Sequence, residues 1–475
     1  METYKQQWFG NIRGDILAGL VVALALIPEA IAFSILAGVD PMVGLYASFV
    51  IAVTISFIGG RPAMISAATG AMAIVIVSLV KDHGLQYLLA ATILTGVIQI
   101  IFGFLKVSKL MKFISNAVML GFVNSLALLV FIAQTPHFLG KDFTTWIFLL
   151  VTIALVYLIP YVIKGIPSPL ITVVILTVVA IYSGVNLSTV GDMGAITTSL
   201  PTFLLPDIPL NFETLKIILP YSLALAVVGL MESLMTAQLL DEMTDSFSNK
   251  DVEARGQGVA NILNGFLGGM AGCAMIGQSI INVISGGRGR LSTFVAGAFL
   301  MFLIIVLGDY VKQIPMPVLA GVMVVVCIKQ FDWSSFKYVA KAPKPDVFVM
   351  LLTVALVMYT HNLAIGVVAG VLVSGIFFVA KIAGIKIKQV DGIYMVEGQL
   401  FFASTEYFLR YFKQLPKQDR IIIDLMYSQV WDESAVKALE KLKTNLAGKQ
   451  IEVVYQNVRP KSQAMIERIL HRQEV

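Results

Sequence analysis

Two carboxylates interrupt apolar segments and are the first candidates for chemistry. Glu232 lies within ILPYSLALAVVGLMESLMTAQLL, and Glu29 follows Pro28 in an apolar run near the start of the chain. A charged carboxylate at the centre of a bilayer costs roughly 3 kcal/mol or more, so such residues usually face a cavity. Glu232 shares a helical face with Thr236, and we expect Glu232 to exchange a proton or, together with the Thr236 hydroxyl, to help hold a small cation. The alternatives are a protonated Glu232 bonded to a neighbouring helix and a packing role for Glu29.

Two glycine-rich stretches lie downstream of these carboxylates. GGRPAMISAATG covers residues 59–70 and GGMAGCAMIGQSIINVISGGRG covers residues 268–289, and each contains the triplet AMI. Glycine costs a helix about 1 kcal/mol relative to alanine, so a broken helix is favoured over a continuous one. Paired breaks in the two halves of a membrane chain indicate a transport site between repeats. Close packing through small residues is the alternative.

The helix starts that follow the two breaks are expected to bind an anion without a fixed charge. Opposed helix N-termini present free N–H groups and positive dipole ends. Arg288 and Arg290, in the GGRGR loop, are predicted to be topology determinants rather than ligands. Cys273 has no Cys or His at metal spacing, so we expect it to pack as a small residue. The neutral donors near the two helix starts are Ser66, Thr69, Gln278 and Ser279.

The composition indicates a polytopic membrane protein. Of 475 residues 57% are hydrophobic and 13% charged, and the net charge of +5 is spread over short loops, which argues against a nucleic-acid partner. Several apolar segments are too short to cross about 30 Å of bilayer alone, as half-helices would be. The predicted segments are 15–36, 43–59, 65–80, 86–105, 113–134, 145–163, 169–184, 217–239, 253–269, 275–287, 291–308, 316–328, 346–361 and 363–382.

The distribution of basic residues predicts the orientation in the membrane. With a cytoplasmic N-terminus, the inner loops hold many Lys and Arg residues, including Arg61, whereas the long outer loop 185–215 holds none. Because cytoplasmic loops carry an excess of positive charge, both ends of the membrane domain are expected in the cytoplasm, with the protein in the plasma membrane. An even number of segments agrees with this orientation.

After about residue 385 the pattern changes to that of a small cytoplasmic α/β domain. The runs IYMVEGQLFF, RIIIDLM and IEVVYQ predict strands, and Ser434–Lys449 and Lys461–Leu470 predict helices. We therefore divide the chain into a membrane domain, 1–385, and a soluble domain, 386–475. Neither a phosphate-binding glycine loop nor a catalytic triad is apparent in the tail.

Several of these motifs resemble the SulP anion transporters, the solute carrier 26 family. DILAGL at 15–20, Pro28 and GLY at 44–46 resemble its first-helix signature, and EGQLFF at 397–402 with IDL at 423–425 resembles its STAS domain. The resemblance covers nearly the whole chain. It implies fourteen segments in two inverted seven-segment repeats, and usually a homodimer. The first four segments of each repeat would form a core domain that moves like an elevator against a gate domain.

The resemblance also implies roles for individual residues. Sodium-coupled bicarbonate members hold the ion with an aspartate and a threonine, where this chain has Glu232 and Thr236; glutamate there is more similar to proton-coupled or uncoupled members. A basic residue common on the tenth segment is replaced by Gln278, which weakens the case for a divalent substrate. Asp432-Glu433-Ser434-Ala435 departs from the phosphorylatable STAS turn, so no phospho-switch is expected. The anion would lie between the third and tenth segments, which carry Thr69 and Ala274, Met275, Ile276, Gln278 and Ser279.

The sequence therefore predicts a secondary transporter of a small inorganic anion, with Glu232, Thr236 and Glu29 in ion coupling. Sulfate by proton symport is the first expectation, and bicarbonate or chloride, by exchange or by symport with a proton or sodium, is the second. An anion channel and a sensor that reports through the tail are the other classes considered. We expect no enzyme, cofactor or metal site, because no nucleophile with a base and no metal cluster is apparent.

Overall fold

The structure is a computed structural model that describes residues 3–163, 166–209, 211–413 and 419–470. The chain divides into two compact units, Met1–Val371 and Leu372–Val475, and the division falls inside helix α16 (Leu363–Ile382). The first strand of the second unit begins at Lys386. The domain boundary expected near residue 385 therefore stays a prediction, and it lies between the last apolar helix and this strand.

Each of the fourteen predicted segments corresponds to a helix. Within the described ranges, nine helices are long and apolar enough to cross a membrane, whereas α4 and α11 have only 14 and 9 residues. These two are the predicted half-helices. The helices are α2 (Ile12–Ala37), α3 (Pro41–Ile58), α4 (Gly70–His83), α5 (Leu85–Phe104), α6 (Asn116–Gln134), α7 (Phe143–Val162), α8 (Ser168–Ser183), α9 (Phe212–Thr244), α10 (Lys250–Phe266), α11 (Ile276–Ile284), α12 (Arg290–Val311), α13 (Met316–Gln330), α15 (Lys344–Thr360) and α16.

Two short α-helices of the first unit, and α17 (Thr405–Lys413) of the second, were not predicted from the sequence. The two in the first unit are α1 (Tyr4–Phe9) and α14 (Ser334–Lys341), which follows α13. Both mix polar and apolar residues over fewer than three turns, so neither produces the long apolar run by which membrane segments are recognised.

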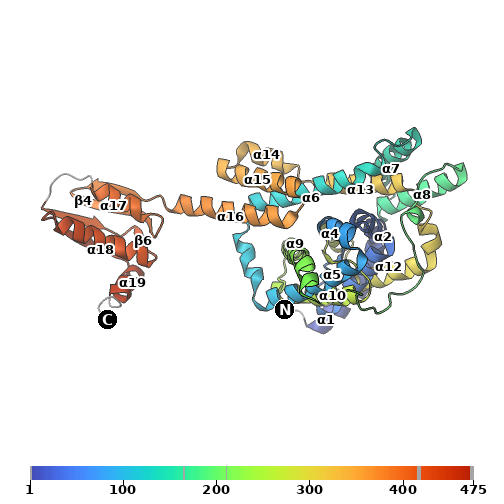
Figure 1. Cartoon of the computed structure of the whole chain (residues 1–475), viewed down its shortest axis with the longest axis horizontal. Coiled ribbons are helices and arrows are strands. Elements are labelled where there is room, and N and C mark those ends of the chain that lie inside the picture. Colours follow the sequence, from blue (N-terminus) through green and yellow to red (C-terminus); the bar gives the residue numbers. More distant parts are fainter. Residues whose placement is uncertain (1–2, 164–165, 210, 414–418, 471–475) are drawn as a thin grey trace. The chain divides into compact units, whose positions relative to one another are not determined.

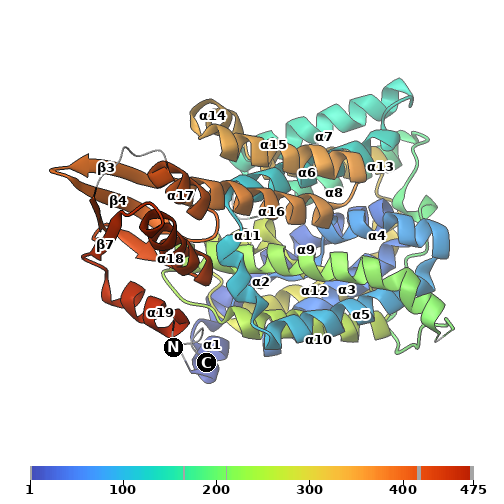
Figure 2. The ribbon, with the colours of Figure 1, turned by 60° about the vertical axis from the view of Figure 1, so that its left-hand side comes forward.

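The helices of the first unit pack as a core and a gate. In the core, α2–α5 contact α9–α12, with α5 along α10 and α12 along α2 and α3. In the gate, α6 contacts α13 and α15, and α7 contacts α8 and α13. Figure 2 shows the gate helices α6, α7, α13 and α15 on one side of the core helices, and Figure 1 shows the same grouping. The predicted core, made from the first four segments of each repeat, is confirmed.

The core brings α5 and α10 into backbone contact. A Cβ atom added at Gly258 would lie 2.5 Å from the Gly96 carbonyl oxygen, and one added at Gly96 would lie 2.3 Å from that of Gly258. Such distances leave no room for a methyl group on either helix. Small residues therefore set this crossing, as is common where helices pack inside a membrane.

Both helix breaks form extended backbone. β1 (Ser66–Ala68) pairs antiparallel with β2 (Gly272–Ala274), with Ser66 opposite Ala274 and Ala68 opposite Gly272. Each strand leads directly into a half-helix, with Thr69 as the N-cap of α4 and Met275 as that of α11. Thr69 and Met275 therefore occupy equivalent positions in the two repeats. The AMI triplets at 63–65 and 274–276 are alike in sequence but do not occupy equivalent positions. The expected span 65–80 is also corrected, because residues 66–69 are strand and cap.

The second unit is an α/β domain. Its strands are β3 (Lys386–Val390), β4 (Ile393–Leu400), β5 (Arg420–Asp424), β6 (Ser428–Val430) and β7 (Glu452–Gln456), in the order β3-β4-β5-β7 with β6 beside β4. The β3–β4 pair is antiparallel and the other pairs are parallel. The helices are α17 (Thr405–Lys413), α18 (Glu433–Ala447) and α19 (Pro460–Leu470), which places the two predicted helices correctly.

Asp432 and Asp424 hold the turns at one end of this sheet. Asp432 is the N-cap of α18 and accepts the Ala435 N–H at 2.9 Å. The segment 432–435, which was expected to differ from a phosphorylatable turn, therefore caps this helix. Burial raises the pKa of Asp424, but three hydrogen bonds outweigh it and lower that pKa below its ordinary value. The donors are the Met426 N–H, the Asn457 amide and the Gln456 amide.

Candidate functional site

The paired strands β1 and β2 place the starts of α4 and α11 at opposite ends of one short ribbon. The strands are antiparallel, so the two half-helices leave the ribbon in opposite directions, and both N-termini point back toward it. Three paired residues separate the helix starts by roughly 10 Å. The first N–H groups of a helix have no intrahelical acceptor and carry a partial positive charge. The ribbon is therefore flanked by two ends that attract an anion.

A chain of three side chains links one helix end to the carboxylate of α9. The Cys273 thiol donates to Glu232 Oε2 at 3.0 Å, and the Thr69 hydroxyl lies 3.2 Å from the Cys273 sulfur. All three are buried, with 5% of Glu232 exposed. Because the thiol has one proton, which it gives to Glu232, the Thr69 hydroxyl donates to the sulfur. The expectation that Cys273 only packs is wrong, since its thiol joins Thr69 to Glu232.

Two other polar side chains of α9 form hydrogen bonds with backbone groups. The Thr236 hydroxyl donates to the carbonyl of Glu232 at 2.7 Å, four residues back, so it serves the helix rather than the carboxylate. The neighbouring Ser233 hydroxyl accepts the Ala274 N–H at 3.0 Å, which ties β2 to α9. Ser233 was not among the predicted site residues, and its position next to Glu232 was the only signal for it.

Glu29 and Gln278 meet at the start of α11. The Gln278 amide donates to Glu29 Oε1 at 2.8 Å, and its own oxygen is buried without a hydrogen-bond partner among the described residues. Glu29 is half-buried, and Gln278 is 2% exposed. A second carboxylate therefore reaches the site from α2, on the side of α11 and opposite to the Thr69 end.

The remaining predicted residues build the ribbon. The Ser279 hydroxyl accepts the Ile65 N–H at 3.0 Å, and the Met275 N–H donates to the Ile65 carbonyl at 2.8 Å. The Ser66 hydroxyl accepts from the Gln257 amide at 2.7 Å. Ile276 begins α11, directly after its cap. Direct contact of these residues with an anion stays a prediction.

Asn261, an amide side chain that was not predicted from the sequence, holds the second strand, β2, in place. Asn261 accepts the Gly272 N–H at 2.9 Å and donates to the Gly272 carbonyl at 3.0 Å, so it binds both backbone groups of that residue. It also donates to Gln99 Oε1 at 2.9 Å. Asn261 lies on α10 between Gly258 and Gly265, and a polar residue in a glycine-rich helix was the available signal.

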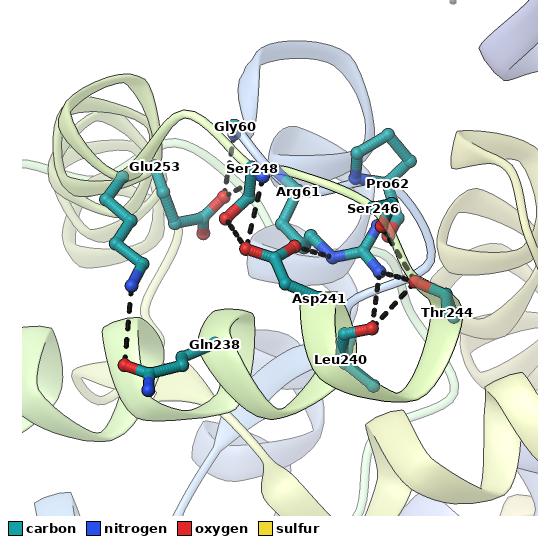
Figure 3. A network of polar contacts seen from close by, with 11 residues as sticks. Gly60, Arg61, Pro62, Gln238, Leu240, Asp241, Thr244, Ser246, Ser248 and Glu253 are labelled. Atoms are coloured by element: carbon teal, nitrogen blue, oxygen red, sulfur yellow. Dashed lines mark hydrogen bonds and ion pairs between the residues drawn. The ribbon is translucent and has the colours of Figure 1, made fainter. Parts of the chain in front are cut away.

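A network of charged groups holds the loop that leads into β1 (Figure 3). Arg61 pairs with Asp241 at 3.0 Å and donates to the carbonyl of Leu240 at 3.0 Å. Glu253 accepts the N–H groups of Gly60 and Arg61 at 2.7 and 3.1 Å. Glu253 also accepts from Gln257, the residue that holds Ser66. The network therefore connects the end of α3, the end of α9 and the start of α10 to the ribbon.

Arg290 has a structural role beyond the predicted one. It is 8% exposed and donates to the carbonyls of Ser56 and Gly59 at 3.0 and 2.7 Å, at the C-terminus of α3. Arg288 donates to the Val283 carbonyl at 2.6 Å, near the end of α11. Cations at helix C-termini are favourable because the free carbonyls there are negative. Both arginines therefore hold helix ends, and among the residues that the structure describes neither forms a hydrogen bond with the ribbon.

Comparison with known proteins identifies the family. The sulfate permease family model matches residues 12–146 and 141–353, and the STAS domain model matches residues 384–474. This chain belongs to the sulfate permease family. A Bacillus subtilis member, "Putative sulfate transporter YbaR", is 56% identical over 472 residues, which cover 98% of this chain and 99% of that protein.

Two solved structures share the fold of this sulfate permease family chain. Murine solute carrier 26 family member A9, an anion transporter in the inward-facing state, matches with a TM-score of 0.84 at 20% identity, over 97% of this chain and 88% of that one. The transmembrane domain of the cyanobacterial bicarbonate transporter BicA matches with a TM-score of 0.67 at 24% identity, over 77% and 98%. The chain is thus a multi-pass membrane anion transporter of the SulP/SLC26 family with a C-terminal STAS domain.

Proposed function

We propose that this chain is a secondary active transporter that carries sulfate together with a proton. The observation that carries the proposal is the contact series Thr69–Cys273–Glu232, which joins a buried carboxylate to the N-cap of a half-helix. A coupling group and an anion-binding end are thereby connected by hydrogen bonds. The name of the 56% identical relative supports sulfate as the substrate.

The direction of these hydrogen bonds gives a mechanism for coupling. With Glu232 ionised, Cys273 donates to the carboxylate and Thr69 donates to Cys273, so the Thr69 proton points away from the helix end. Once Glu232 is protonated, its O–H donates to the sulfur, the thiol turns toward Thr69, and the hydroxyl is free to donate to an anion. Protonation also removes a negative charge that repels sulfate. Proton and anion therefore bind together.

The backbone pairing of the ribbon supports movement of the site as one body. β1 and β2 come from different repeats but are hydrogen bonded to each other, and both lie in the core. We propose that the core carries the ribbon past the gate in an elevator motion. We further propose a homodimer in the plasma membrane with both termini in the cytoplasm, on the basis of the family and of the distribution of basic residues.

Bicarbonate or chloride is the second candidate substrate, with exchange or sodium coupling in place of proton symport. The observation in its favour is Gln278, a neutral side chain that donates to Glu29 at the start of α11. The lack of a cation there removes about twice as much Coulomb attraction from a divalent anion as from a monovalent one, which weakens the case for a divalent substrate. The structural similarity to BicA is compatible with this alternative.

The test is uptake of radiolabelled sulfate into proteoliposomes with and without an inward proton gradient. If one proton accompanies each anion, one pH unit of gradient changes the equilibrium accumulation about tenfold, because it is worth about 1.4 kcal/mol. Glu232→Gln should abolish this dependence, and Glu242→Gln, an exposed position on the same helix, should keep it. Gradient-independent sulfate uptake would refute proton coupling, and uptake of bicarbonate or chloride without sulfate would overturn the proposal in favour of the second candidate.

A further inference from the structure

Helix α14 has no part in the transport site, yet its position is firmly fixed. It lies between α13 and α15 of the gate, and Figure 2 shows it beside the start of α15. The Asp332 N–H donates to Asn124 Oδ1 on α6 at 2.9 Å, and Asp332 Oδ1 accepts the Ser334 N–H at 2.9 Å. Because it connects two apolar helices at the end they share, α14 lies where the membrane meets water.

One face of α14 is apolar and exposed. Trp333, Phe336 and Val339 are 59%, 64% and 43% exposed, and their spacing of three residues places them on one side. Ser335, which is 4% exposed, faces the protein. The ring of Trp333 lies 5.1 Å from that of Phe331 and 6.1 Å from that of Phe336. Large aromatic side chains gathered in this way are typical of the interface of a bilayer.

A stripe of lysines runs beside the apolar face. Lys337 and Lys341 are one turn apart on α14, and Lys344 begins α15; all three are exposed. No carboxylate within ion-pair distance of these lysines is found in the part of the chain that the structure describes. An anionic phospholipid is complementary to this surface, because the lysines match its negative headgroup and the apolar strip matches its acyl chains.

We propose that α14 is an interfacial helix that binds anionic phospholipid of the surrounding bilayer. Trp333, Phe336 and Val339 enter the boundary between headgroups and acyl chains, while Lys337, Lys341 and Lys344 contact the phosphate groups. The position of this apolar strip at the end of two apolar helices favours a lipid surface over a soluble acidic protein, because acyl chains at the bilayer boundary cover the aromatic rings there. Because α14 joins two gate helices, the bound lipid holds the gate at a fixed depth.

The test measures the fluorescence of Trp333 in proteoliposomes, taken as the difference between the unmutated full chain and Trp333→Phe. The vesicles contain phosphatidylcholine and phosphatidylglycerol, and one or the other carries brominated acyl chains at the same mole fraction. We expect brominated phosphatidylglycerol to quench Trp333 several-fold more, with an enrichment of roughly fivefold for each lysine engaged. High salt should reduce this preference in the unmutated protein.

The triple variant Lys337→Gln, Lys341→Gln, Lys344→Gln should be quenched equally by both lipids. The matched control replaces three exposed lysines of the STAS unit, Lys441, Lys443 and Lys449, by glutamine and should keep the preference. Equal quenching of the unmutated protein by both lipids would overturn the proposal, as would quenching by aqueous iodide alone. The salt dependence tests the same charges if the triple variant does not fold.

Discussion

Replacing Glu253 by glutamine should loosen the loop that leads into β1. The side chain of Glu253 is fully buried, and its two oxygens accept three hydrogen bonds, from the N–H groups of Gly60 and Arg61 and from the Gln257 amide. Glutamine has nearly the same size but no charge, and it brings two donors into a site that already supplies three. The change therefore removes electrostatic support without creating a cavity.

The size of the effect follows from the number of hydrogen bonds. A hydrogen bond to a charged group contributes about 1.5–3 kcal/mol and a neutral one about 0.5–1.5, so three bonds lose about 3 kcal/mol. Glutamine avoids the cost of burying a charge, which offsets part of this loss. Arg61, however, loses the stabilising effect of a nearby negative charge. We expect the free energy of opening the loop to fall by about 2 kcal/mol, equivalent to about thirtyfold faster amide exchange if opening limits exchange.

The assay is hydrogen–deuterium exchange of the purified full chain, read by mass spectrometry on peptides that cover residues 59–66. The control is Glu242→Gln on α9, where the carboxylate is exposed and accepts a hydrogen bond from Gln238. This control should change exchange in 59–66 by less than about twofold, because surface hydrogen bonds contribute little. If both variants exchange alike in this segment, the buried carboxylate does not hold the loop and the reasoning is refuted.

Three further predictions concern other contacts. Cys273→Ala should lower the initial rate of sulfate uptake about fivefold, because one hydrogen bond of roughly 1 kcal/mol is lost at the carboxylate, whereas Cys273→Ser should retain that bond and the rate; equal rates for Cys273→Ala and the unmutated protein would contradict a role for the Thr69–Cys273–Glu232 contacts. Gly258→Ala should destabilise the core by about 1–3 kcal/mol, seen as a lower unfolding midpoint in detergent, while Gly375→Ala, which meets open space, should not. The lowered pKa of Asp424 means that its charged form stabilises the STAS unit above the ordinary value of 3.8 and that this support is lost as the pH falls below it. Asp424→Asn should therefore lower stability at neutral pH and flatten its dependence on acid, measured by thermal unfolding.

Much of the fold could be predicted because membrane helices leave a strong signal. Long apolar runs located fourteen helices, and strings of glycine located both breaks. The register of the breaks could not be read from composition, because the AMI triplets at 63–65 and 274–276 are alike in sequence but occupy different places. Which residue caps each half-helix depends on the pairing of β1 with β2, and that contact is not local.

The site was predictable where an unusual residue stood in an apolar run or where neutral donors lay beside a glycine-rich break. Glu232 and Glu29 were found because a carboxylate at membrane depth is costly. Cys273, Ser233 and Asn261 were missed as partners, since a cysteine, a serine or an asparagine in a small-residue segment packs as readily as it bonds. Their roles depend on which helix lies opposite, and only the three-dimensional arrangement gives that information.

The pairing of β1 with β2 also has a consequence for biosynthesis. Ser66 and its partner Ala274 are 208 positions apart, so the ribosome needs roughly 10–40 s after making the first strand to complete the second. During that interval the first break is in the membrane with unpaired backbone groups, which lipid cannot satisfy. The first repeat therefore has to wait in a shielded environment, at the insertion machinery or beside another chain, until its counterpart emerges. Slowing translation between the repeats should increase degradation of the nascent protein.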